Sequence, residues 1–258
     1  MAPLFLSPGR FLGEPEPSVG TPRAVSSRYA TGTTLPMHEH ARGHFTFVVR
    51  GEYEESIAHS VAVRHSGDLL WHPAGAAHAE RHGRAGRHLM VEPSRELERS
   101  LPDTPRCFAA EEAAALGPRL LIESTGDDEL ALEAVLQELR LVLHGPTRER
   151  GQPAWVSDVE DQMRSCFREA LRLDDLAATA GVAAAHLART WRRLHGRTIG
   201  EELRRLRIGW ACRRVASSER SLAEIAAEAG FADQAHLARS FRKLIGCTPS
   251  QYRERARR

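Results

Sequence analysis

An internal repeat in the last third of the chain most constrains its fold. Residues 176–182 (Leu-Ala-Ala-Thr-Ala-Gly-Val) return as 225–231 (Ile-Ala-Ala-Glu-Ala-Gly-Phe), and His-Leu-Ala-Arg occurs at 186–189 and again at 236–239. The offset is 49 residues up to the glycine and 50 after it, so the second copy has one extra residue in its turn. Each copy predicts a short helix, a glycine turn and a second helix. This is the arrangement of a helix-turn-helix, whose second helix lies in a DNA major groove.

Helix starts and apolar spacing support two such units. Three capping boxes, each a hydroxyl residue followed three positions later by Glu or Gln, predict helix starts. They are Thr198 with Glu201, Ser221 with Glu224, and Thr248 with Gln251. Apolar residues three and four apart predict a buried stripe on each second helix. The stripes are Leu187, Trp191 and Leu194 in the first copy, and Leu237, Phe241 and Leu244 in the second. A helix over 201–217 is predicted to join the two units.

The opposite face of each second helix is the candidate base-reading surface. The second copy offers Asp233, Gln234, His236 and Arg239 there, whereas Arg189 is the only strong reader among alanines in the first. Gln pairs with adenine and Arg with guanine through two hydrogen bonds, which contribute about 1–3 kcal/mol of discrimination each. The second copy is therefore predicted to carry most of the sequence discrimination.

The charge distribution agrees with DNA binding. Residues 173–258 hold 17 lysines and arginines against 9 acidic residues, whereas residues 1–172 hold 19 basic against 25 acidic residues. Only the basic C-terminal part is expected to be attracted to phosphate. The predicted phosphate contacts are Arg192, Arg193, Arg204, Arg205, Arg207, Arg242 and Lys243.

Two such units joined by one helix resemble the AraC/XylS-type transcription regulators. In that family the positions matching Ala185, Ala188 and Arg189 face bases, as do those matching Gln234, His236 and Arg239. The resemblance implies double-stranded DNA and RNA polymerase as partners, and activation as the commoner role.

The first hundred residues have a different pattern, in which short β-prone runs alternate with Gly and Pro turns. This pattern predicts a small antiparallel β-barrel. The spacings Gly32-x5-His38-x-His40-x3-His44-x6-Gly51 and Gly67-x5-Pro73-x-Gly75-x2-His78-x3-His82 resemble both cupin motifs. His44 stands where cupin enzymes usually have a metal-binding Glu, and His82 where the second motif ends in Asn. The sensor domains of many AraC-type regulators are cupin-like.

The histidines of these motifs form a candidate metal or effector site. His38 and His40 are two apart on a predicted strand and so point to one face. If that face is the barrel interior, His44 and His78 can converge on it. Several imidazoles suit Zn, Fe, Ni or Cu. The alternative is a metal-free site, in which neutral histidines bond to one another, to water or to an organic effector. The histidines at 59, 65, 72, 82 and 88 are expected at the surface or behind the ligands.

The fold class predicted is α+β in two domains, a cupin-like antiparallel β-barrel followed by an all-α domain with two helix-turn-helix motifs. The predicted divisions are a sensor domain over 1–125, a dimerisation helix and linker over 126–153, and a DNA-binding domain over 154–258. Apolar residues at helical spacing mark the helix, which serves either a homodimer contact or packing against its own barrel. They are Leu132, Val135, Leu136, Leu139 and Val142. Residues 147–153 are predicted to be the linker.

The sequence predicts a sequence-specific transcription regulator, not an enzyme, whose N-terminal domain senses a small molecule or metal ion. No signal peptide or membrane-spanning run is evident, so a cytoplasmic location away from membranes is expected. Two alternatives stay open. A cupin-type metalloenzyme would turn over a substrate on the metal-loaded barrel. A ligand-independent DNA-binding protein would use its barrel only to dimerise, and would tolerate loss of His38 and His78.

Overall fold

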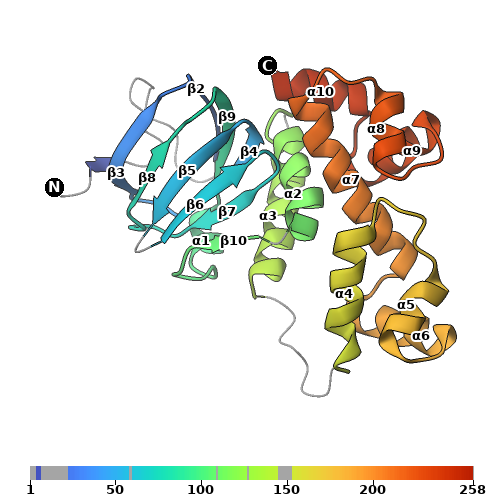
Figure 1. The fold of residues 1–258 in the computed structure, drawn as a ribbon. Coiled ribbons are helices and arrows are strands. Elements are labelled where there is room, and N and C mark those ends of the chain that lie inside the picture. Colours follow the sequence, from blue (N-terminus) through green and yellow to red (C-terminus); the bar gives the residue numbers. More distant parts are fainter. Residues whose placement is uncertain are drawn as a thin grey trace.

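The computed structural model describes residues 4–6, 23–57, 60–108, 110–126, 128–144 and 153–257. A β-rich N-terminal part is followed by a helical C-terminal part (Figure 1), which confirms the mixed α+β class. The predicted linker, except Pro153, lies outside the described residues.

The strands of the described residues form two five-stranded sheets. In hydrogen-bonded order, the first sheet contains β1 (Leu4–Leu6), β3 (Thr34–His40), β8 (His78–Arg81), β5 (Glu52–Ile57) and β6 (Ser60–His65). The second contains β10 (Arg106–Cys107), β7 (Leu69–His72), β4 (His44–Arg50), β9 (Gly86–Glu92) and β2 (Arg23–Tyr29). Neighbouring strands are antiparallel except β1 and β3, which are parallel.

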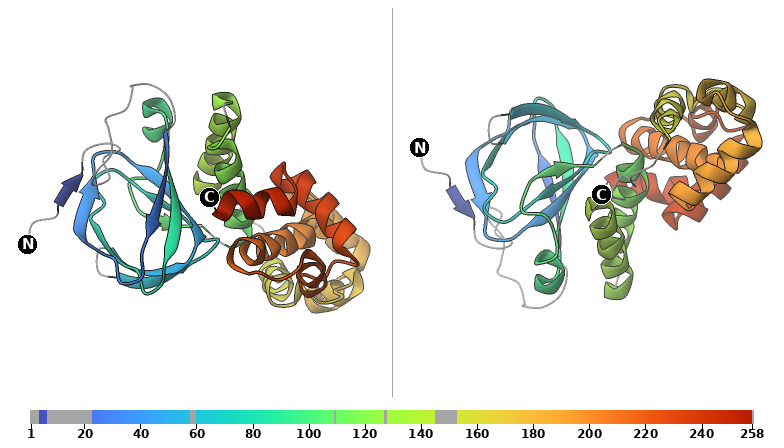
Figure 2. Two further views of the ribbon diagram at one scale, coloured as in Figure 1. Left: turned by 90° about the horizontal axis from the view of Figure 1, so that it is seen from above. Right: turned by 90° about the horizontal axis from the view of Figure 1, so that it is seen from below.

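The predicted barrel is not closed by hydrogen bonds in this part of the chain. Tight turns instead carry the chain from one sheet to the other, so that β3, β4 and β5 alternate between the sheets and do not pair in sequence. Gly51 makes one of these turns with a φ of +93°, a backbone conformation that favours glycine. The two sheets curve around a common interior (Figure 2).

Two helices, α2 (Ala110–Glu123) and α3 (Glu129–His144), lie between the sheets and the C-terminal helices (Figures 1 and 2). A short helix, α1 (Arg95–Glu98), precedes them. Gly117 of α2 lies so close to β4 that an added Cβ would overlap the ring of Phe47. The inner face of α3 is buried in the same core through Leu132, Val135, Leu136, Leu139 and Leu143. The predicted stripe of α3 therefore packs within its own chain.

The C-terminal part consists of seven helices in the described residues. They are α4 (Trp155–Cys166), α5 (Leu173–Ala180), α6 (Ala184–His195), α7 (Ile199–Ser217), α8 (Leu222–Glu228), α9 (Gln234–Ile245) and α10 (Pro249–Arg257). The capping boxes predicted at Thr198 and Ser221 form, as do the hydrogen bonds between Thr248 and Gln251. No helix in the described ranges combines the length and hydrophobicity needed to cross a lipid bilayer.

The long helix α7 takes part in two separate hydrophobic cores. Its first half packs with α4, α5 and α6 around Met163, Leu176 and Trp191. Its second half, through Val215, joins α8, α9 and α10 in a core that continues through α2 and α3 to the sheets. Helices α2 and α7 approach each other closely where they cross, because a Cβ added to Gly209 would overlap the Cβ of Ala114.

This crossing predicts a stability difference between two glycines of α7. We expect Gly209→Ala to lower the free energy of unfolding by roughly 1–2 kcal/mol, because overpacking costs about 1–3 kcal/mol and better helix propensity recovers at most about 1 kcal/mol. Gly200→Ala in the first turn of α7 is the control, since only Arg204 lies within 4 Å of its added Cβ, at 3.8 Å. Urea unfolding should show this control to be as stable as the natural chain or more so. Equal unfolding midpoints for the two variants would contradict the close crossing.

Candidate DNA interface and histidine cluster

The two predicted reading helices, α6 and α9, lie near opposite ends of α7 (Figure 1). Each buries the predicted apolar stripe, with Leu187 and Trp191 in α6 and Leu237 and Phe241 in α9. The preceding turns contain Gly181 and Gly230, whose φ angles are +64° and +79°. The repeat in the sequence is therefore a repeat in the structure, with two helix pairs built on the same plan.

The predicted base-reading residues divide by exposure. Ala185, Arg189, Asp233, Gln234 and Arg239 are exposed, whereas Ala188 and His236 are half-buried. The Asp233 carboxylate accepts a hydrogen bond of 2.6 Å from the backbone N–H of His236 and so caps α9. The ring of His236 packs edge-on against Phe231, with centroids 5.1 Å apart. Gln234 and Arg239 are thus exposed hydrogen-bonding side chains that neither the cap of α9 nor the contact with Phe231 engages.

The predicted phosphate contacts also divide. Arg192, Arg193, Arg204, Arg242 and Lys243 are exposed, but Arg205 and Arg207 are half-buried. The guanidinium of Arg207 donates to the carbonyl oxygens of Phe167 and Glu169, at 2.6 and 2.9 Å, and so ties α7 to the end of α4. Arg205 lies between α2, α7 and α9, where burial lowers the pKa of its guanidinium. Arg207 is thus engaged within the chain, and Arg205 is partly withdrawn from solvent.

The four predicted histidines converge inside the sheets. His38 lies opposite His78 in the register of β3 and β8, with ring centroids 4.3 Å apart. His40 lies two residues along β3 from His38, with its ring centroid 4.4 Å from that of His44 on β4. One ring nitrogen from each of His38, His40 and His78 lies within 4.8 Å of the others. All four side chains are buried.

A fifth histidine, His72, belongs to the same cluster. It lies opposite His44 in the register of β4 and β7, and its ring centroid is 4.8 Å from that of His78. Its Nε2 lies 2.7 Å from a carboxylate oxygen of Glu55, a residue with no exposed surface. Its Nδ1 is buried without a hydrogen-bond partner among the described residues. The sequence does contain a signal for this contact. Tyr53, Glu55 and Ile57 alternate along β5, which places Glu55 on the same inward face as two apolar residues.

The hydrogen bonds of the cluster favour metal ligation. The Nδ1 atoms of His38 and His78 lie 2.8 and 3.0 Å from the carbonyl oxygens of Pro36 and Ala76. A proton on each Nδ1 donates to these carbonyls, so each Nε2 keeps a free lone pair, as in ligating histidines. Burial and the neighbouring imidazoles lower the pKa of His40 to about 3. Burial likewise lowers the pKa of His78 to about 4. Neutral imidazole is the form that binds metal.

A second group of buried polar residues lies between the sheets. His82 stacks on Tyr29 with centroids 4.1 Å apart, and its Nε2 lies 3.0 Å from a carboxylate oxygen of Glu80. The His88 ring lies 4.5 Å from that of Tyr53. His72, His82 and His88 are 2%, 1% and 3% exposed, so of the two expected positions, at the surface or behind the ligands, the surface is wrong for these three. Inward-facing strand positions bury them. His59 lies outside the described residues.

Comparison with known proteins places these helices in a family. A family model described as a helix-turn-helix domain matches residues 176–255. The MmsAB operon regulatory protein of Pseudomonas aeruginosa is 29% identical over 210 residues, covering 74% of this chain and 67% of that protein. The regulatory protein SoxS of Escherichia coli K12 is 30% identical over 102 residues, covering 40% of this chain and 89% of SoxS.

Among solved structures, ToxT from Vibrio cholerae is similar with 10% identity and a TM-score of 0.39, over 91% of this chain and 98% of ToxT. A likeness this distant carries no functional inference. The sequence relatives and the matched helix-turn-helix domain carry the assignment, which agrees with the repeat and the exposed arginines. The chain belongs to the AraC family of DNA-binding transcription regulators.

Proposed function

We propose that this regulator reads DNA with two helix-turn-helix units and senses a metal ion or small molecule between its N-terminal, cupin-like sheets. The observation that carries the DNA part is the placement of α6 and α9 near the two ends of α7. The 19 residues of α7 span about 28 Å at 1.5 Å per residue, against roughly 34 Å between successive major grooves. The two reading helices enter adjacent grooves of DNA that bends slightly.

Sequence discrimination is concentrated in α9. This helix presents Gln234 and Arg239, which suit adenine and guanine, whereas α6 presents Arg189 beside alanine side chains. Alanine methyl groups contact thymine methyl groups but add little polar discrimination. The proposal also includes activation of transcription through RNA polymerase, the commoner role in the family.

The histidine cluster is the sensor site in this proposal. His38, His40 and His78 would hold Zn, Fe, Ni or Cu, with His44 and His72 next to them. A bound cation would supply the positive charge that links three imidazole lone pairs. One ring nitrogen of each of these three histidines lies within 4.8 Å of the others, so rotation of these side chains would bring all three onto one cation. Because His38 and His78 lie opposite each other on paired strands, the strands themselves would not have to move.

A homodimer contact is also part of the proposal, through the outer face of α3. The inner face of α3 is used within the chain, but Leu130 and Leu141 are 82% and 63% exposed on the opposite side. Exposed leucines along one helix support a helix–helix contact between two copies.

Arg239→Ala should reduce the difference in binding free energy between the preferred base and the other bases at one position of the binding site by about 1–3 kcal/mol, because a bidentate contact to guanine is lost. Arg242→Ala, on the exposed last turn of α9, should instead weaken binding to all sequences and reduce the salt dependence. The natural protein first selects a binding duplex from random DNA. Fluorescence anisotropy on this duplex and on its single-base variants then measures the affinity and the base discrimination of each protein. A uniform loss with Arg239→Ala would identify that side chain as a phosphate contact.

Protein purified without an affinity tag or chelator should contain close to one transition-metal ion per chain, as measured by mass spectrometry. The double variant His38→Ala/His78→Ala should lose it, because two of the three converging nitrogens are gone. His65→Ala, whose exposed side chain lies outside the cluster, is the control and should keep the metal. Two results together would contradict a metal site: the natural protein contains no metal, and added Zn, Ni, Fe or Cu does not raise its unfolding temperature. The cluster would then be a metal-free effector site or a scaffold.

Leu130→Glu and Leu141→Glu should each convert a dimer into monomers, since burying a carboxylate in an apolar contact is costly. Val61→Glu is a matched control, because Val61 is 65% exposed on β6, away from α3. Sedimentation velocity measures the mass. A natural chain that sediments as a monomer, or variants that stay dimeric, would contradict this contact.

A further inference from the structure

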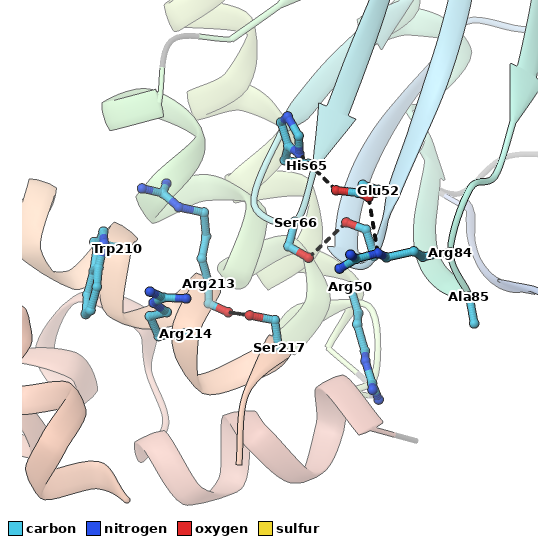
Figure 3. Close-up of a pocket in the computed structure, with 11 residues that line it drawn as sticks. Arg50, Glu52, His65, Ser66, Arg84, Ala85, Trp210, Arg213, Arg214 and Ser217 are labelled. Carbon is cyan, nitrogen blue, oxygen red and sulfur yellow. Dashed lines mark hydrogen bonds and ion pairs between the residues drawn. The ribbon is translucent and has the colours of Figure 1, made fainter. Parts of the chain in front are cut away.

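A pocket of about 710 Å³ lies between the sheets and α7, on the sheet-facing side of the DNA-binding part (Figure 3). Three turns of the sheets and one face of α7 form its walls. The turns contribute Arg50, Glu52, His65 and Arg84, and α7 contributes Arg213 and Arg214. Its size falls in the range of small-molecule sites, roughly 300–1,000 Å³.

The charge of this pocket is strongly unbalanced. Among the described residues that line it, four are arginines and one, Glu52, carries a carboxylate. Glu52 is itself engaged, with Arg84 at 3.4 Å and His65 at 3.7 Å. In the described residues, Arg50 and Arg214 form no ion pair with a carboxylate. The carboxylate of Asp68, outside the lining, acts on Arg213, but positive charge still exceeds negative charge in this concave space.

The arginines from α7 are held in place by packing. The stem of Arg213 lies on the turn at Gly67, where an added Cβ would overlap it. Burial lowers the pKa of the Arg213 guanidinium, which reflects the loss of solvation around this cation. The guanidinium of Arg214 lies over the ring of Trp210, 5.2 Å from its centroid. Stacked and packed guanidinium groups lose little further freedom when they bind an anion.

We propose that this pocket binds a small organic anion with two or more carboxylate or phosphate groups. Arginine guanidinium groups match both oxyanions through paired hydrogen bonds. The polar and charged walls do not suit a long hydrocarbon chain. The site is separate from the histidine cluster, which lies inside the sheets.

The position of the pocket gives the anion a regulatory effect, and this part rests on the proposed DNA-reading function. The bound anion bridges Arg50 of the sheets and Arg214 of α7. Since α7 joins both reading helices, the anion stabilises one placement of those helices relative to the sheets. A ligand shifts such an equilibrium only by its difference in affinity for the two arrangements.

The test uses the full chain and two probes, succinate as a dicarboxylate and 3-phosphoglycerate as a phosphate ester. Titration calorimetry should show saturable binding of at least one probe. In thermal unfolding, that probe should raise the unfolding temperature of the protein more than sodium chloride of equal ionic strength does. Arg50→Gln and Arg214→Gln, one from each wall, should each weaken binding at least tenfold. Arg81→Gln is the control, because Arg81 lies outside the pocket and pairs with Glu54 at 2.9 Å. Whichever probe binds identifies the oxyanion.

Two results would overturn the proposal. One is the absence of saturable binding by both probes, or equal binding by the natural chain and both pocket variants. The other is weaker DNA binding by both variants without any probe bound, which would make these arginines DNA phosphate contacts. DNA binding by the natural chain is measured separately, so failure of the anion site and failure of the DNA-reading function are distinguishable.

Discussion

The crossing of α2 and α7 is the contact on which the two-domain arrangement depends. Gly209 and Ala114 have the smallest side chains available, and this lets the two helix backbones approach closely. The core around this crossing continues from the sheets through α2 to α9 and α10, while α4, α5 and α6 pack in a core of their own. The second reading unit is therefore fixed to the sheets, whereas in the described residues the first unit shares a core with α7 and not with the sheets.

The sequence predicted the DNA-binding part closely because its signals are local. Capping boxes, turn glycines and apolar spacing act within a few residues, so Thr198, Gly181 and Leu187 have the roles expected of them. It did not predict that Arg207 binds the carbonyls at the end of α4, since that contact joins residues 40 positions apart. Nothing in the sequence predicted the packing of α2 on α7, which depends on the shapes of two helices.

The N-terminal part was predicted less completely, because its contacts join residues that are distant in the sequence. Motif spacing indicated that His38, His40, His44 and His78 converge, but it did not include His72. That residue enters the cluster through a cross-strand register with His44, and register between β4 and β7 is not visible in one sequence. The histidines that the motifs predicted include no negatively charged residue to balance a dication. The structure brings Glu55 behind His72, and bonds from His72 and Arg64 outweigh the effect of burial and lower the pKa of Glu55 to about 2. If a dication binds in the cluster, this buried carboxylate would provide part of the negative charge that a ligating Glu provides elsewhere.

The histidine cluster and the arginine pocket lie in different parts of the same sheets. The first sheet connects them, because it contains β3 and β8, which carry His38 and His78, and also β5, whose first residue, Glu52, lines the arginine pocket. In the proposed function, a ligand in the cluster would act on the wall that faces α7 through β5, which pairs directly with β8. If both proposed sites prefer one placement of α7 against the sheets, their effects are coupled in proportion to how strongly each prefers it. The second reading unit shares a core with the sheets and the first does not, so a shift of α7 against the sheets would act first on the packing of the second unit. DNA, whose successive major grooves have a fixed spacing, accepts only placements of the two reading helices that match this spacing.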